Sequence, residues 1–243
     1  MQSRIIKIIT VIILLALLPK LSSAHGYWLD IKGNGKINDT VKIQICYGEI
    51  DDYGIRHRET GPELKYLGDF KLQIVDENGS TSNLLLKPGS DNFSSYFVPA
   101  KKGVYRIIAT NNGLPVVDRS GTKGQNVRPV EYLYATYNVA GIPSITKPGQ
   151  FLDIMVVPKD KLTLVKAFIN NKPAPEGTKL RVFNPDNWEK YLTVNEKGEA
   201  VFLAKQQGLY IIRLDWNDTT PGEYNGTPYT AVRHRCNYCL WVP

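Results

Sequence analysis

The segments Lys102-Gly-Val-Tyr-Arg-Ile-Ile108 and Gln207-Gly-Leu-Tyr-Ile-Ile-Arg213 are two versions of one strand, and their repetition decides the fold. In each, a glycine suited to a turn precedes an aliphatic residue, a tyrosine and further aliphatic residues, which is typical of a turn leading into a buried strand. The segments 71–75 and 179–183, Lys-Leu-Gln-Ile-Val and Lys-Leu-Arg-Val-Phe, precede them at similar distances. A shared order and spacing indicates a duplicated structural unit.

Strand patterns dominate the remaining chain, and no stretch keeps a helical period over three turns. Short runs rich in Val, Ile, Tyr and Phe are separated by Gly, Pro, Asn and Asp. These runs are 41–46, 70–75, 104–109, 151–156, 179–183 and 209–214. We therefore expect an all-β protein of two tandem immunoglobulin-like β-sandwich domains, residues 25–140 and 146–243. Each is about the size of a seven-stranded sandwich, and the junction falls near residues 139–147.

The first 24 residues have the pattern of a secretory signal peptide. Arg4 and Lys7 precede an apolar run, 8–18, and Ser22-Ser-Ala24 forms a cleavage site of small residues. An uncleaved membrane anchor is the alternative, but the run has 11 residues where a spanning helix needs about 20. We expect cleavage after Ala24, a periplasmic or secreted product without a membrane span, and His25 as its first residue.

Composition narrows the classes of function. Removing the leader takes away three positive charges, so the formal net charge falls from +7 to +4. Basic residues are scattered among acidic ones, which argues against nucleic acid as a partner. The three histidines of the chain stand in no recognisable nucleophile context, and no phosphate-binding glycine loop follows a strand. We expect a binding protein and not an enzyme.

The three cysteines, Cys46, Cys236 and Cys239, all lie in the part of the chain expected to be exported. An oxidising compartment favours a disulfide, either within the Cys-x-x-Cys pair or from one of its members to Cys46, and leaves one thiol over. Metal ligation is the alternative. His234 and Cys236 share one side of a strand, and Cys239 could return to that side after a short turn.

The segment His25-Gly-Tyr-Trp-Leu29 resembles the mature start of a bacterial family described as periplasmic components of nickel or cobalt uptake, NikM-like in name. The resemblance continues through 39–48, 129–135, 149–156, 171–174, 195–200 and 208–212. It implies a periplasmic protein of two sandwiches that handles a transition metal, with a membrane transporter or envelope protein as partner. The tail 232–239, Val-Arg-His-Arg-Cys-Asn-Tyr-Cys, departs from the family pattern.

An N-terminal histidine is itself a candidate chelator. Its α-amine has a reference pKa of about 7.7 to 8.0 and is partly neutral at pH 7, and its imidazole can bind the same ion. Such nitrogen ligands suit Ni(II) or Cu(II), with Co(II) as the other candidate. We name His25 as the first ligand, with His57, His234, Cys236 and Cys239 as further candidates. His57 lies in the charged segment 51–59, and a solvated loop is its alternative role.

Two other classes of function remain open. A structural or adhesive module could bind an envelope protein or glycan through aromatic residues in turn-rich segments: Trp188, Trp216, Tyr224 and Tyr229. The start His25-Gly26 also resembles that of copper-dependent polysaccharide monooxygenases, although the duplication indicates two sandwiches where those enzymes have one.

Overall fold

The computed structural model describes residues 25–122, 124–143 and 146–243. The predicted signal peptide, 1–24, lies outside the described residues, as do residues 144 and 145 of the predicted junction. The strands are β1 (Gly26–Lys32), β2 (Val41–Ile50), β3 (Arg56–Arg58), β4 (Lys71–Val75), β5 (Thr81–Leu84), β6 (Lys87–Pro88), β7 (Asn92–Phe97), β8 (Gly103–Asn111), β9 (Val127–Val139), β10 (Leu152–Lys159), β11 (Leu162–Ile169), β12 (Lys172–Pro173), β13 (Lys179–Phe183), β14 (Glu189–Thr193), β15 (Glu199–Phe202), β16 (Gly208–Asp218), β17 (Gly222–Tyr224), β18 (Thr227–Tyr229) and β19 (Ala231–Val242). Two short 3-10 helices are η1 (Pro62–Asp69) and η2 (Ser120–Thr122). No described helix is long and apolar enough to cross a membrane.

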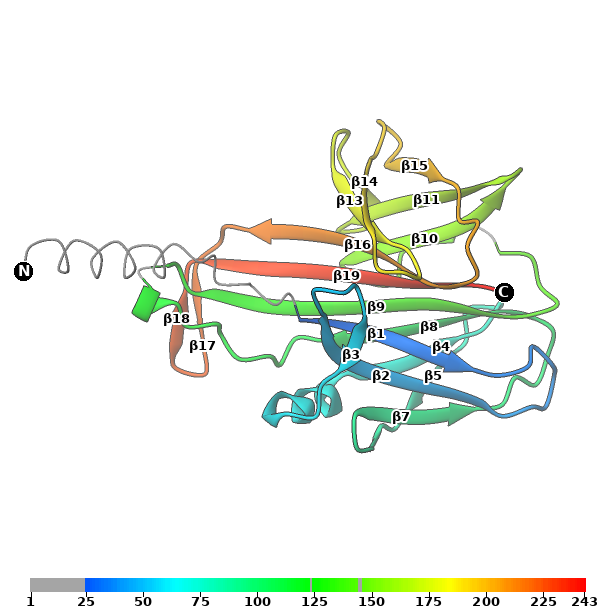
Figure 1. Ribbon diagram of the computed structural model, residues 1–243, viewed down its shortest axis with the longest axis horizontal. Coiled ribbons are helices and arrows are strands. Elements are labelled where there is room, and N and C mark those ends of the chain that lie inside the picture. Colours follow the sequence, from blue (N-terminus) through cyan, green and yellow to red (C-terminus); the bar gives the residue numbers. More distant parts are fainter. Residues whose placement is uncertain (1–24, 123, 144–145) are drawn as a thin grey trace, which may run out of the picture.

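A central sheet of eight strands runs through both halves of the chain, in the order β14-β13-β16-β19-β9-β8-β4-β5. A sheet of the first half, β1-β2-β7-β6 with β3 beside β2, packs on one of its faces. A sheet of the second half, β10-β11-β12 with β15 beside β11, packs on the other face. The molecule thus has three layers of sheet, and the two outer sheets project from opposite sides of the long central strands (Figure 1).

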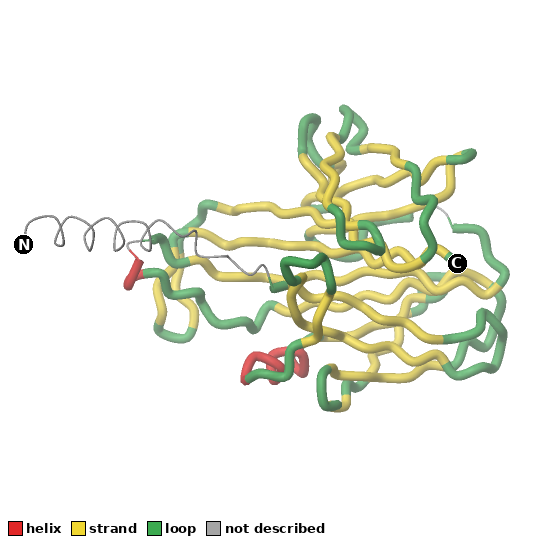
Figure 2. The backbone as a smooth tube through the Cα atoms, in the orientation of Figure 1, coloured by secondary structure: helices red, strands yellow, loops and turns green. Residues whose placement is uncertain are grey.

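The two halves meet where β9 pairs with β19 in parallel, while every other pair of neighbouring strands in the central sheet is antiparallel. The parallel register runs from Ala231 opposite Val127 to Cys239 opposite Ala135. In Figure 2 the long strands of both halves form one continuous sheet. The backbone hydrogen bonds of this pair therefore join what the sequence presents as two units.

Alternate residues of the central strands fill two separate cores. On β9, Leu133 and Ala135 belong to the first core, between the central sheet and β1-β2-β7. Tyr132 and Tyr134 belong to the second core, between the central sheet and β10-β11. Because side chains alternate between the faces of a strand, β9 is buried on both sides. The first core also includes Phe183 and other residues of the second half, so each half completes the core of the other.

The duplication predicted from sequence is visible in detail. The strands β8 and β16 begin at Gly103 and Gly208, whose φ angles of 142° and 123° favour glycine. The phenolic oxygen of Tyr105 accepts a hydrogen bond from the backbone N–H of Lys101, four residues earlier. That of Tyr210 accepts one from Gln206, again four residues earlier. The fold is all-β with immunoglobulin-like sandwiches, as predicted, but the sandwiches lie on opposite faces of one shared sheet.

Candidate metal centre

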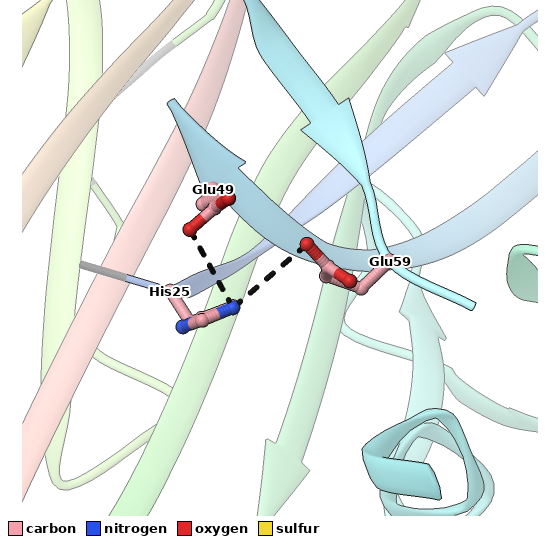
Figure 3. A group of neighbouring side chains, drawn as sticks. All are labelled: His25, Glu49 and Glu59. Atoms are coloured by element: carbon pink, nitrogen blue, oxygen red, sulfur yellow. Dashed lines mark ion pairs between the residues drawn. The ribbon is translucent and has the colours of Figure 1, made fainter. Parts of the chain in front are cut away.

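Three neighbouring strands bring one histidine and two glutamates together. His25 directly precedes β1, Glu49 lies near the end of β2, and Glu59 directly follows β3. The pairing of Gly26 with Gly48 aligns the first two strands. The backbone N–H of Glu59 donates to the carbonyl oxygen of Tyr47, which extends the third. Figure 3 shows the imidazole with one ring nitrogen facing both carboxylates.

The distances within this group suit a bound cation. His25 Nε2 lies 3.7 Å from Glu49 Oε2 and 3.9 Å from Glu59 Oε1. One ligand atom from each residue lies within 4.8 Å of the other two. A tetrahedral ion with bonds of about 2.1 Å holds its ligands about 3.4 Å apart. Small side-chain rotations would therefore bring all three atoms into coordination.

The imidazole of His25 is held by packing on one side and is open to solvent on the other. It stacks on the ring of Tyr47 with centroids 5.2 Å apart and planes 15° from parallel. Tyr47 in turn contacts Tyr27 at 4.9 Å. Burial, followed by the nearby carboxylates of Glu63 and Glu59, raises the pKa of Tyr47 to about 12, so its phenol stays neutral. The side chains of His25, Glu49 and Glu59 remain 39, 31 and 34 % exposed, which leaves an ion a route in and out.

The start of β1 is held in place by the second half of the chain. Asn237 on β19 donates from Nδ2 to the carbonyl oxygen of Tyr27 at 2.9 Å. The same side chain accepts a hydrogen bond from Nε of Arg213 on β16, also at 2.9 Å. Nη2 of Arg213 lies against Gly26, where a Cβ would stand only 2.7 Å away. A side chain at position 26 would make the guanidinium of Arg213 shift, and His25 emerges from a backbone that buried polar groups hold.

His57 takes no part in this group. Its Nε2 lies 2.7 Å from Asp51 Oδ2, and its ring is exposed on β3. The hydrogen bond with His57 is the main cause that lowers the pKa of Asp51. His57 pairs in register with Glu49, so it is a close neighbour of the site. The expectation that it joins His25 on one ion does not match this geometry.

His234 lies on the opposite face of the central sheet from His25. Its Nδ1 is 2.9 Å from the hydroxyl of Tyr132, and its ring packs on Phe151 with centroids 4.4 Å apart. Burial is the main cause that lowers the pKa of His234 and favours the neutral imidazole. The second core accounts for this histidine, and it contributes no ligand atom near His25.

The tail cysteines do not converge with His234 as one ligand set. Cys236 belongs to the second core and Cys239 to the first, because β19 continues as a strand where we expected a turn. Residues three apart in a strand are about 10 Å from each other, too far for a disulfide, which needs Cα atoms within about 7 Å. The predicted disulfide within Cys-x-x-Cys is therefore ruled out by strand geometry.

All three cysteines are buried free thiols. Burial raises the pKa of Cys46 and of Cys239 to about 12, and the pKa of Cys236 well above its ordinary value. Protonated thiols are poor metal ligands and poor nucleophiles. Cys239 has a structural contact instead, because its Sγ accepts the backbone N–H of Leu29 at 3.2 Å.

The four aromatic residues suggested for an adhesive surface do not form one patch. Trp216 and Tyr229 pack against the second core. Tyr224 lies under the guanidinium of Arg128, 4.3 Å from its ring centroid. Trp188 stands apart from them in the turn before β14 and is largely exposed.

The sequence analysis missed both glutamates and the buried groups behind them. The strand alternation contains the signal for Glu49, since Tyr47 and Glu49 share a face of β2 and pair beside Tyr27 and His25. No such local signal marks Asn237 or the other groups of the second half, which reach β1 only through the tertiary fold.

Comparison with known proteins identifies no family for the chain. No family model matches the chain, and no curated protein matches it. Among solved structures, the D0-D1 domain of intimin is similar over 90% of this chain and 100% of that one, at 8% identity and a TM-score of 0.25. Dimeric latent PorU from Porphyromonas gingivalis is similar over 87% of this chain and 20% of its own, at 9% identity and a TM-score of 0.24. The sheet order and packing of the chain itself define an all-β protein of β-sandwich architecture.

Proposed function

We propose that the protein binds a divalent transition-metal ion at His25, Glu49 and Glu59, as an exported accessory protein of nickel, cobalt or copper uptake or handling. The observation that carries this proposal is the clustering of one imidazole and two carboxylates within 4.8 Å on three adjacent strands. Resemblance to the NikM-like family at the start of the chain supports the choice of metal and of a periplasmic setting. A membrane transporter would be the partner that receives the ion.

The donor set indicates the class of ion. One nitrogen and two carboxylate oxygens suit borderline divalent ions such as Ni(II), Co(II) and Zn(II), and Cu(II) by the general order of affinities. Soft Cu(I) prefers sulfur, and the described cysteines are buried away from this site. The partial exposure of all three ligands favours an exchangeable ion over a permanent structural one.

Removal of the predicted leader would offer a second arrangement, in which the α-amine of His25 takes part in binding. This amine forms a chelate ring with Nδ1, whereas Nε2 is the nitrogen that faces the glutamates. The two arrangements need different rotations of the ring. Placing one alanine ahead of His25 removes the amine from the chelate and leaves the Nε2 site intact, so the two can be separated.

The copper monooxygenase interpretation gains no support from this site. It requires a second histidine beside His25, and the structure brings two carboxylates there while His57 pairs with Asp51. We therefore propose binding and not catalysis.

The test is titration calorimetry of protein that starts at His25, with Ni(II), Co(II), Zn(II) and Cu(II). His25→Ala and the double variant Glu49→Gln, Glu59→Gln should each weaken binding by at least about tenfold, since each removes direct ligands. His57→Ala is the matched control, an exposed histidine on the neighbouring strand, and should bind as the unmodified protein does. Equal affinity in all four proteins, or loss confined to His57→Ala, would refute the proposed site.

A further inference from the structure

A second surface is built where one loop of each half meets the other. The loop 51–55 joins β2 to β3, and the loop 184–188 joins β13 to β14. Asn187 donates from Nδ2 to the carbonyl oxygen of Gly54 at 2.7 Å and accepts a hydrogen bond from Arg56. Gly54 also approaches the carbonyl oxygen of Asp186 so closely that a Cβ would stand 3.2 Å from it. Tyr53 directly precedes Gly54 and Trp188 directly follows Asn187, so this contact brings together the chain segments that carry the two aromatic residues.

Both loops are ordered by their own hydrogen bonds before any partner arrives. Asp51 accepts the backbone N–H groups of Tyr53 and Ile55 at 2.9 and 2.8 Å. In the other loop, Asn184 accepts the N–H of Trp188 at 2.7 Å. A surface that is fixed in advance loses little conformational freedom on binding. The two aromatic residues are thus presented on rigid turns.

Tyr53 and Trp188 are unusually open to solvent for residues of their kind, at 89 and 77 % exposure. Neither belongs to the first or the second core. Large aromatic side chains are on average highly buried, and rigid exposed ones are enriched where proteins bind partners. The fold itself gives no account of these two rings.

The charged residues of the two loops are all acidic, although the whole chain carries a formal net charge of +7. Asp52 and Asp186, one from each loop, are exposed. The guanidinium of Arg56 turns inward instead, 5.2 Å from the ring centroid of Trp28. Lys190 and Leu192 lie on the same face of β14, and Leu192 packs in the second core. Lys190 is therefore on the side of the strand away from the first-half sheet. We call Asp52, Tyr53, Asp186 and Trp188 the aromatic-acidic patch.

We propose that the aromatic-acidic patch binds a lysine- or arginine-rich segment of a partner protein. Tyrosine and tryptophan faces attract ammonium and guanidinium groups. The flanking carboxylates complement the same positive charge and speed encounter with it. The patch needs both halves of the chain, because each supplies one loop. It is separate from the proposed metal site and does not depend on it.

The test measures fluorescence polarisation of a labelled lysine oligomer on the full mature protein, with a labelled glutamate oligomer and a neutral oligosaccharide as comparison probes. Trp188→Ala and Tyr53→Ala should each weaken lysine-oligomer binding about two- to fivefold, the range for an exposed cation–π contact. Asp52→Asn with Asp186→Asn should weaken it further and flatten its dependence on salt. Trp241→Ala is the matched control, a partly exposed tryptophan on β19.

The outcomes separate the alternatives. Selective binding of the lysine oligomer, lost in the patch variants and kept in Trp241→Ala, supports the proposal. Salt-independent binding of the oligosaccharide that Trp188→Ala abolishes would overturn it in favour of a glycan site. Equal lysine-oligomer binding by every variant would overturn it outright. Because the substituted side chains are exposed, unchanged thermal unfolding of the variants checks that these results do not reflect misfolding.

Discussion

One continuous sheet with a core on each face should unfold as a single unit, and two leucines test this. Leu133 on β9 belongs to the first core, and Leu180 on β13 belongs to the second. Both are fully buried, so Leu133→Ala and Leu180→Ala make the same chemical change on opposite faces of the central sheet. We expect each substitution to destabilise the whole molecule.

The size of the effect distinguishes one unit from two. A buried Leu→Ala substitution costs about 2–5 kcal/mol, because it removes apolar contacts and leaves a cavity. In a cooperative unit of 150–250 residues, 1 kcal/mol shifts the melting temperature by about 2–4 °C. A loss of about 3 kcal/mol would then lower the single transition by about 6–12 °C. In an independent unit of about 100 residues the same loss would shift one transition by about 12–24 °C and leave the other in place.

Differential scanning calorimetry of the mature protein makes the measurement. We expect one peak whose calorimetric and van't Hoff enthalpies agree, and that peak should move in both variants. Leu203→Ala, at an exposed leucine, is the control and should stay within about 0.5 kcal/mol of the unmodified protein. Two resolved peaks, each moved by only one of the buried substitutions, would refute the single shared unit.

Two further predictions concern single buried polar groups. Asn237→Ala removes the hydrogen-bond donor to Tyr27 and the acceptor of Arg213. We expect it to lower the free energy of unfolding in urea by about 2–4 kcal/mol and to weaken metal binding at least about tenfold in calorimetry. Unchanged metal affinity would show that β1 is held by other contacts. Burial raises the pKa of Asp153 from 3.8 to about 6, against hydrogen bonds from backbone N–H groups such as that of Gly149. The folded state therefore holds this proton more tightly than the unfolded state. The associated stability is present below about pH 4 and is lost as the pH rises to about 6, by up to about 3 kcal/mol. Urea unfolding at about pH 4 and pH 7 measures this loss of stability, which should be smaller in Asp153→Asn than in the unmodified protein. An equal loss in both proteins would contradict the assignment of the effect to Asp153.

The fold class and the duplication could be predicted because both rest on local patterns. Turn glycines and apolar residues at period two mark strands such as β8 and β16 wherever they end up in space. The parallel contact of β9 with β19 could not be predicted in the same way. The run Tyr132-Leu-Tyr-Ala135 is apolar on both faces, which indicates burial on both sides but does not name the partner strand.

The candidate site shows the same division. His25 follows from the predicted cleavage after Ala24, a local feature of the sequence. Glu49 and Glu59 join it through the register of three strands, and that register depends on the tertiary fold. The prediction for the tail was wrong at one step. We assumed a turn before Cys239, and a turn there would reverse the side of the strand to which the Cys239 side chain points.

The alternation of side chains along β19 also links the second half to the proposed metal site. His234 and Cys236 face the second core, while Asn237 and Cys239 face β1 and hydrogen-bond to its backbone. The second sandwich thus supplies side chains that hold the backbone of β1 next to His25. On this arrangement a first half ending at residue 140 would keep all three proposed ligands and lose the groups that hold one of them. The duplicated second half therefore has a direct part in the proposed metal site, because it fixes where the chain presents His25.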